Sequence, residues 1–166
     1  ARSCKLGLVQ LYLASALQKI PLEKRSNLAV QLAKSAEFRD DPRLPLLIWY
    51  GFEPTVAKNA GTATSLIVLT EMSLLRRLIA RRLTEELEHN PAAVNVLVHM
   101  LTLGEEEQYR LDILEGMSQA LRGWRKAPAP KLWGEVSAVL AKSDSAKVKE
   151  AAQKLGVGVV SGFSGS

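Results

Sequence analysis

Cysteine and histidine are almost missing from this chain, and their scarcity excludes several kinds of site. Cys4 is the only cysteine among 166 residues, and His89 and His99 are the only histidines. A single thiol can form neither an internal disulfide nor a multi-cysteine metal site, and no C-x-x-C-H motif is present to attach haem. We therefore predict no cofactor and no metal site, and we expect Cys4 to be a half-buried structural thiol.

Aromatic residues and strand-like patterns are also scarce. Aromatics make up 5% of the residues, whereas the 47% hydrophobic fraction, rich in Leu, Ala and Val, is typical of a globular helical protein. Apolar residues recur at spacings of three and four, and no segment alternates as a strand would. No apolar run reaches the 20 or so residues that a membrane span needs. These patterns predict an all-α fold without a membrane span.

The apolar spacing predicts a series of helices over about 5–20, 21–33, 42–50, 63–72, 73–89, 91–104, 105–125, 132–140 and 145–155. On the first helix one apolar face is expected, made of Leu6, Val9, Leu13, Ala16, Leu17 and Ile20. On the helix over 105–125 a narrow apolar arc is expected, made of Tyr109, Ile113, Met117, Ala120, Leu121 and Trp124.

Cap and stop signals punctuate this series. Asp41-Pro42 and Asn90-Pro91 each place a capping side chain before a first-turn proline, and Asp144 is expected to cap the last helix. Gly51 and Pro54 should interrupt the third helix, and Gly104 and Gly156 should end later ones. Ala127–Pro130 reads as a rigid turn.

Two helical hairpins are expected in succession, at about 90–125 and 130–155. Their length suits HEAT-like or armadillo-like units, whose period is about 40 residues. The sequence thus predicts an α-solenoid of such hairpins, as a single domain over 1–156. Residues 157–166 are expected to form a flexible tail or a remnant of cloning. The opening ARSCKLGLVQLYL resembles the interior of a helix, so we expect a fragment of a longer protein.

Charge is spread unevenly along the chain. The net charge is +5, but residues 1–83 carry 13 Lys and Arg against 6 Asp and Glu, a net +7. Such asymmetry indicates either an acidic partner or the packing of one half on the other.

The sharpest basic feature is the run of Arg76, Arg77, Arg81 and Arg82. On a helical wheel Arg77 and Arg81 project outside the apolar face, whereas Arg82 falls inside it. A buried guanidinium needs carboxylates or helix-end carbonyls, so pairing inside the fold is favoured over an anion or nucleic-acid patch. Arg110 poses the same question, because it lies within the apolar arc of its helix.

Tryptophan, histidine and one aspartate complete the candidates. Trp49, Trp124 and Trp133 occupy apolar positions, which favours core packing over the stacking of bases. His89 is expected at a helix end and His99 as a partly buried structural residue. Some HEAT-like DNA glycosylases combine Trp, Asp and Arg, so Asp112 on the flank of its helix leaves a glycosylase open as an alternative.

The segment DDPRLPLLIWYGFEP at 40–54 resembles the helical-repeat region of a large family of membrane-bound dehydrogenases from Planctomycetes and Verrucomicrobia. So do LYLASALQKIPLEKRSNLAVQLA at 11–33, LLRRLIARRL at 74–83 and ILEGMSQALRGWRKAPAPKLWGEVSAVLAKS at 113–143. In that family a sugar-dehydrogenase-like β-propeller precedes HEAT-like repeats, and a c-type cytochrome domain follows them.

The resemblance implies a context rather than an active site. It implies a non-catalytic spacer or interaction segment of an exported, cell-envelope redox protein, whose partners are neighbouring domains or another protein. This segment lacks propeller strands and a haem motif, so no functional residue of the family can be placed on it. Two alternatives stay open: a basic nucleic-acid-binding protein or glycosylase, and a free-standing scaffold that binds a peptide in its groove.

Overall fold

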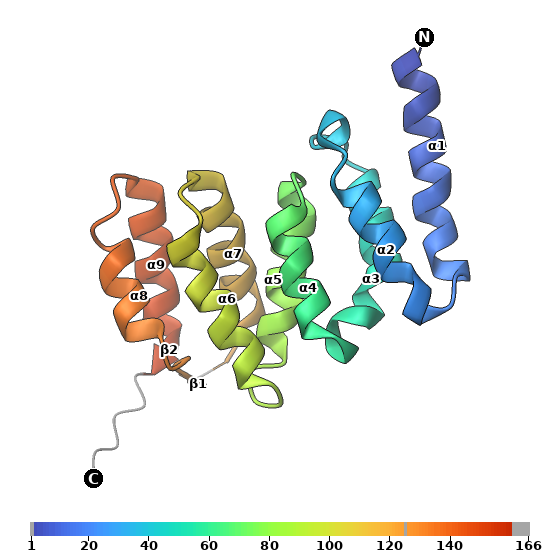
Figure 1. The fold of residues 1–166 in the computed structure, drawn as a ribbon. Coiled ribbons are helices and arrows are strands. Elements are labelled where there is room, and N and C mark those ends of the chain that lie inside the picture. The colour runs from blue at the N-terminus through green and yellow to red at the C-terminus, as the bar shows by residue number, and fades with distance from the viewer. Residues whose placement is uncertain (1, 125, 161–166) are drawn as a thin grey trace. The chain divides into compact units, whose positions relative to one another are not determined.

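Helices account for 75% of the chain in its computed structural model, which confirms the all-α prediction (Figure 1). The structure describes residues 2–124 and 126–160, with the side chains of 5–124 and 126–159. The chain divides into two compact units, unit 1 over 1–79 and unit 2 over 80–166. The single domain over 1–156 stays a prediction, because separate compactness does not measure whether two units unfold together.

Unit 1 is built from four complete helices, two 3₁₀ turns and the start of a fifth helix. These elements are α1 (Arg2–Ala16), η1 (Leu17–Lys19), α2 (Leu22–Ala33), η2 (Ala36–Phe38), α3 (Leu44–Lys58), α4 (Ala60–Leu69) and α5 (Ser73–Glu85), which crosses into unit 2. α3 is the central helix, because α1, α2 and α4 all pack against it, and α2 also contacts α4.

α3 continues through both residues that were expected to interrupt it. Its buried stripe runs through Ile48, Phe52 and Val56, which are at most 1% exposed. Gly51 lies against η1, where an added Cβ would come 2.4 Å from the Leu17 Cβ. An interior proline such as Pro54 costs about 3 kcal/mol or more, so burial of this stripe must outweigh that cost. The predicted break was therefore wrong, because tertiary packing overrides local propensity.

The side chains beside this stripe are less buried than expected. Ile48 is fully buried as predicted, but Leu46 and Trp49 are half-buried. Asp41 Oδ1 does accept hydrogen bonds from the backbone N–H groups of Arg43 and Leu44, both at 2.8 Å. However, α3 begins at Leu44 with Arg43 at the N-cap position, so the predicted Asp41-Pro42 start was wrong by two residues.

The predicted apolar face of the first helix was wrong in part. Leu17 is completely buried as predicted, but Leu6, Val9 and Leu13 are 51%, 54% and 41% exposed. Ala14, which was not assigned to that face, is completely buried. Small residues allow the close approach of another helix, so the contact surface of α1 follows its small side chains rather than its large ones. As a result α1 keeps several large apolar side chains exposed.

α4 begins three residues earlier than predicted. The side chain of Asn59 accepts a hydrogen bond from the Thr62 N–H at 3.0 Å and so caps the helix. The helix ends at Leu69, and the Thr70 hydroxyl then accepts from the Met72 N–H and donates to the Ala33 carbonyl.

Unit 2 holds the rest of α5 and four further helices. These are α6 (Pro91–Leu103), α7 (Glu107–Ala120), α8 (Trp133–Leu140) and α9 (Ala146–Gly158). α6 packs against α8 and α7 against α9, while α6–α7 and α8–α9 are the connected pairs (Figure 1). Two layers of two helices result. The two connected pairs correspond to the predicted hairpins.

Two caps show where sequence signals succeeded and failed. Asn90 caps α6 ahead of Pro91 as predicted, accepting from the Ala93 N–H at 3.3 Å. For α9 the cap is Ser145, whose hydroxyl oxygen accepts from the Val148 N–H at 3.2 Å. The prediction of Asp144 was therefore wrong by one residue.

The arc predicted on α7 is mostly buried, but the helix is shorter than expected. Ile113, Met117 and Leu121 are at most 7% exposed, while Tyr109 and Trp124 are half-buried. α7 ends at Ala120, so Trp124 lies beyond it, and Arg125 lies outside the described residues.

The last helix is longer than expected. α9 passes Gly156 and ends at Gly158. Residues Val159–Val160 (β2) then pair in parallel with Ala127–Pro128 (β1), in the segment expected to be a rigid turn. Within the described part of the chain this short pairing is the only sheet. The rest of the predicted tail, residues 161–166, lies outside the described residues.

No helix among the described residues is both long enough and apolar enough to cross a membrane, in agreement with the prediction.

Candidate functional site

Three arginines occupy the same place in three different helices. Arg25, Arg76 and Arg110 are each the fourth residue, of α2, α5 and α7 respectively. In each case the side-chain Nε donates to a main-chain carbonyl near the end of the preceding helical segment. The C-terminal end of a helix leaves carbonyls without intrahelical partners and carries a partial negative charge. A guanidinium stabilises it both by donating hydrogen bonds and by its positive charge.

Arg25 donates from all three of its side-chain nitrogens to main-chain carbonyls. Its Nε donates to the Ile20 carbonyl at 2.7 Å, and its Nη1 and Nη2 donate to the carbonyls of Gly51 at 3.0 Å and Gln18 at 2.9 Å. The sequence reasoning missed this residue. Its position one turn into a helix that follows another helix directly is the signal that could have found it.

Arg76 is the buried arginine of the basic run. It is 7% exposed, and it donates to the carbonyls of Ile67 and Thr70 at the end of α4. On the helical wheel Arg82, rather than Arg76, was expected to lie inside the fold, paired with carboxylates or with helix-end carbonyls. That assignment missed how closely the end of α4 approaches the first turn of α5.

Arg81 and Arg82 of the run each pair with a carboxylate one turn further on. Arg82 is half-buried and its Nη1 lies 2.5 Å from the Oε1 of Glu86, four residues further along the chain. It therefore pairs with a carboxylate, but this local pair is partly exposed and does not lie inside the fold as predicted. Arg81 lies 2.9 Å from the Glu85 Oε1 and is exposed, as predicted. Arg77 was expected on the surface but is half-buried, and its Nε is buried.

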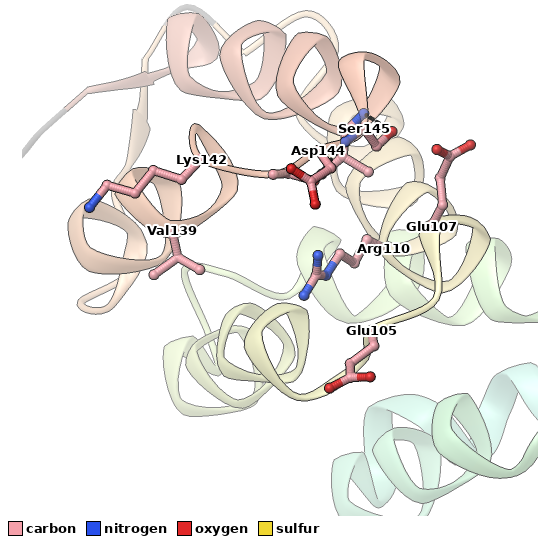
Figure 2. Close-up of a pocket in the computed structure, with 9 residues that line it drawn as sticks. Glu105, Glu107, Arg110, Val139, Lys142, Asp144 and Ser145 are labelled. Carbon is pink, nitrogen blue, oxygen red and sulfur yellow. Dashed lines mark hydrogen bonds between the residues drawn. The ribbon is translucent and has the colours of Figure 1, made fainter.

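Arg110 shares this anchor but leaves its outer nitrogens open. Its Nε donates to the Leu101 carbonyl at 3.1 Å, which fixes the half-buried side chain against the end of α6. Within the described residues, no acceptor lies within hydrogen-bonding distance of its two terminal amino groups. These amino groups face a hollow of about 640 Å³ (Figure 2).

The hollow lies among the start of α7, the end of α8 and the loop into α9. Its walls include Glu105, Arg110, Val139, Lys142 and Asp144. Figure 2 shows the Arg110 guanidinium near the middle, with Asp144 on the α9 side, Glu105 on the α6 side and Lys142 extending away from it. The hollow therefore offers one inward cation between two flanking carboxylates.

Glu107, another residue that lines the hollow, forms an ion pair with α9. The Lys147 Nζ lies 3.8 Å from the Glu107 Oε1, and both side chains are largely exposed. The pair links the first turns of α7 and α9, and it leaves Arg110 as the cation that points inward.

Gly104 and Tyr109 set the path from α6 into α7. A Cβ on Gly104 would come 2.2 Å from the Tyr109 ring, so the absence of a side chain lets the ring lie against the backbone. Gly104 does cap the end of α6, as predicted. Trp133 is 7% exposed and Trp49 and Trp124 are half-buried, so none stands out as a fully exposed stacking platform.

Asp112 and the histidines occupy places that differ from the predictions. Asp112 is fully buried rather than on the flank of α7, and its Oδ1 accepts from the Gln108 Nε2 at 2.8 Å. A carboxylate closed off in this way is out of reach of a flipped base. His99 is exposed rather than partly buried. His89 is 81% exposed and lies 3.9 Å from the Glu86 carboxylate after the end of α5.

The described residues contain no group of three or more His, Cys, Asp or Glu side chains suited to a metal ion. The side chain of Cys4 lies outside the described part. The chain matches no protein-family model, no curated protein and no solved structure.

Proposed function

We propose that this chain is a helical-repeat interaction segment that spaces or docks other protein domains and carries no catalytic centre of its own. The observation that carries the proposal is the packing of next-but-one helices. α6 packs against α8 and α7 against α9 in unit 2, while α1 packs against α3 and α2 against α4 in unit 1. HEAT-like and armadillo-like arrays are built from layers of this kind, and they commonly present extended binding surfaces.

The apolar surface of α1 supports a role in association. Tyr12 is 77% exposed, and Leu8 and Val9 on the same helix are more than half exposed. An exposed patch of large apolar side chains often marks a surface that binds another protein. In a repeat array such a face packs against a neighbouring repeat or domain.

The resemblance to the membrane-bound dehydrogenases supplies the context of the proposal. In that context the segment lies between a propeller and a cytochrome domain in the cell envelope, and its partners belong to the same polypeptide. The alternating helix layers fit the repeat region of such a protein, and the proposal places the redox chemistry in the flanking domains.

The test has two parts. The complete reading frame should encode a β-propeller before this segment and a C-x-x-C-H motif after it, and a frame without either ends the dehydrogenase context. The flanking domains, produced separately, should bind the segment in a calorimetric titration. A Val9→Lys/Tyr12→Lys double variant should weaken this binding, with Val157→Lys, a change of the same kind at an exposed residue of α9, as matched control. Equal binding by both variants would remove α1 from the interface.

A further inference from the structure

We infer that the hollow around Arg110 is a binding site for a carboxylate group carried on a peptide segment of a partner protein. This inference rests on the proposed interaction role and names the chemistry of one contact. Its starting point is the difference between Arg110 and the two arginines that share its position. Arg25 gives every donor nitrogen to main-chain carbonyls, whereas Arg110 gives only Nε.

The geometry of Arg110 is suited to an oxyanion. A guanidinium presents parallel N–H donors that match the two oxygens of a carboxylate. The Leu101 carbonyl holds the Nε side of the fork at 3.1 Å, so the side chain is already oriented and loses little freedom when an anion binds. The remaining amino groups point into the hollow rather than along the surface (Figure 2).

The flanking charges favour a carboxylate over a phosphate. Glu105 and Asp144 lie on two sides of the guanidinium and are exposed. Two nearby negative charges repel a phosphate, which carries close to two charges at neutral pH, more strongly than a singly charged carboxylate. The same two carboxylates can pair with basic residues beside the bound acid.

The size of the hollow favours a peptide over a small free acid. Its volume of about 640 Å³ is much larger than one carboxylate, and falls in the usual range of ligand pockets, about 300–1,000 Å³. A segment with an acidic residue between basic ones satisfies Arg110, Glu105 and Asp144 together. The expected motif is therefore a Glu or Asp flanked by Lys or Arg.

The test is an NMR titration of the full chain, read at the Arg110 Nε–H and at the backbone amides of 143–146. The probes are a blocked heptapeptide with a central Lys-Glu-Lys, the same peptide with Lys-Gln-Lys, sodium acetate and inorganic phosphate. The Glu peptide should bind about tenfold more tightly than the Gln peptide, as expected for losing a charge-assisted bond. Acetate should shift the same signals more weakly, and phosphate should shift them least.

Variants separate the contributions. Arg110→Lys keeps the charge but loses the fork, and it should weaken binding of the Glu peptide about tenfold. Because Arg110 also holds the end of α6, its variants need a check by circular dichroism. Asp144→Asn and Glu105→Gln change exposed side chains and keep the inference testable if Arg110→Lys fails to fold. Each of these two variants should bind phosphate more tightly and the Lys-Glu-Lys peptide less tightly. Glu135→Gln on α8, the control, should change neither affinity.

Equal affinity for the Glu and Gln peptides would overturn the inference, as would shifts that leave the Arg110 signal unmoved. Phosphate binding more tightly than the Glu peptide in the unaltered chain would also overturn it, in favour of a phosphate site. These outcomes are distinct from failure of the proposed function. A flanking domain that binds equally well to the Arg110→Lys variant would support docking while excluding this contact.

Discussion

Unit 1 and unit 2 differ in how they use their charges. Unit 1 carries 11 Lys and Arg against 6 Asp and Glu, and unit 2 carries 11 of each, so the whole net charge of +5 belongs to unit 1. Yet the more enclosed arginines of unit 1, Arg25 and Arg76, donate to main-chain carbonyls of the same unit. The neutral unit holds Arg110, whose outer amino groups face a hollow. Net charge is thus a poor guide to where a binding site lies.

The largest expected loss of stability comes from truncating a core side chain of unit 1. Phe52→Ala should lower the free energy of unfolding by about 3–5 kcal/mol, because the side chain is fully buried in the central helix. Trp49→Ala should cost clearly less, because Trp49 is half-buried. Urea unfolding of both variants provides the measurement. A larger loss for Trp49→Ala would show that the stripe is assigned wrongly.

The structural role of the arginines in unit 1 gives the next largest effect. Arg76→Met should cost about 1–3 kcal/mol for each carbonyl left buried without a donor. Arg81→Ala should cost at most about 0.5 kcal/mol, as is usual for an exposed pair within a helix. Arg82→Ala should fall between them, since its pair with Glu86 is half-buried. Equal losses from all three positions, measured by chemical denaturation, would contradict the assignment.

Glycine-to-alanine variants test how tightly the backbone is packed in each unit. Gly51→Ala should destabilise unit 1 by about 1–3 kcal/mol, because the new methyl meets the Leu17 Cβ. Gly104→Ala should cost less, because the Tyr109 ring that it meets can move. Gly134→Ala in α8 has open space around it and should stabilise by about 0.5–1 kcal/mol. Thermal unfolding of the three variants would expose any reversal of this order.

A smaller effect separates the two candidate caps of α9. Ser145→Ala should cost about 1 kcal/mol, because the hydroxyl oxygen accepts from the Val148 N–H. Asp144→Ala, one residue earlier, should leave stability nearly unchanged. Hydrogen exchange in the first turn of α9 gives a local readout, which should accelerate only in the serine variant.

The smallest expected effect is weak, salt-sensitive binding of DNA by the basic first half of the chain. Residues 1–83 carry a net +7, so duplex DNA should bind weakly at low salt, and this binding should fade as salt rises. Base excision should be absent, and Asp112→Asn should leave DNA binding unchanged, because Asp112 is fully buried and cannot contact the duplex. A salt-resistant complex with damaged duplex and Asp112-dependent excision would replace the interaction role with a glycosylase.

The sequence alone determined the fold class and most helix positions. Apolar spacing of three and four places most of the helices, because a helix buries one side and its period repeats along the chain. The Asn90-Pro91 cap and the Gly104 stop were readable because they act on their own neighbouring backbone. The sequence also predicted correctly that a guanidinium from the basic run must be satisfied within the fold.

Only the tertiary structure decided which residue filled each role. Pro54 stays inside α3 because burial of Phe52 outweighs a local cost, and α1 turns Ala14 inward while Leu6 and Val9 face solvent. Arg76 rather than Arg82 reaches the carbonyls because the end of α4 lies beside the first turn of α5. The open donors of Arg110 depend on a hollow whose lining comes from residues 105–110 and 139–148, two segments that are separated in the sequence. A helical wheel gives the direction of a side chain, but the acceptors around it come from other parts of the chain.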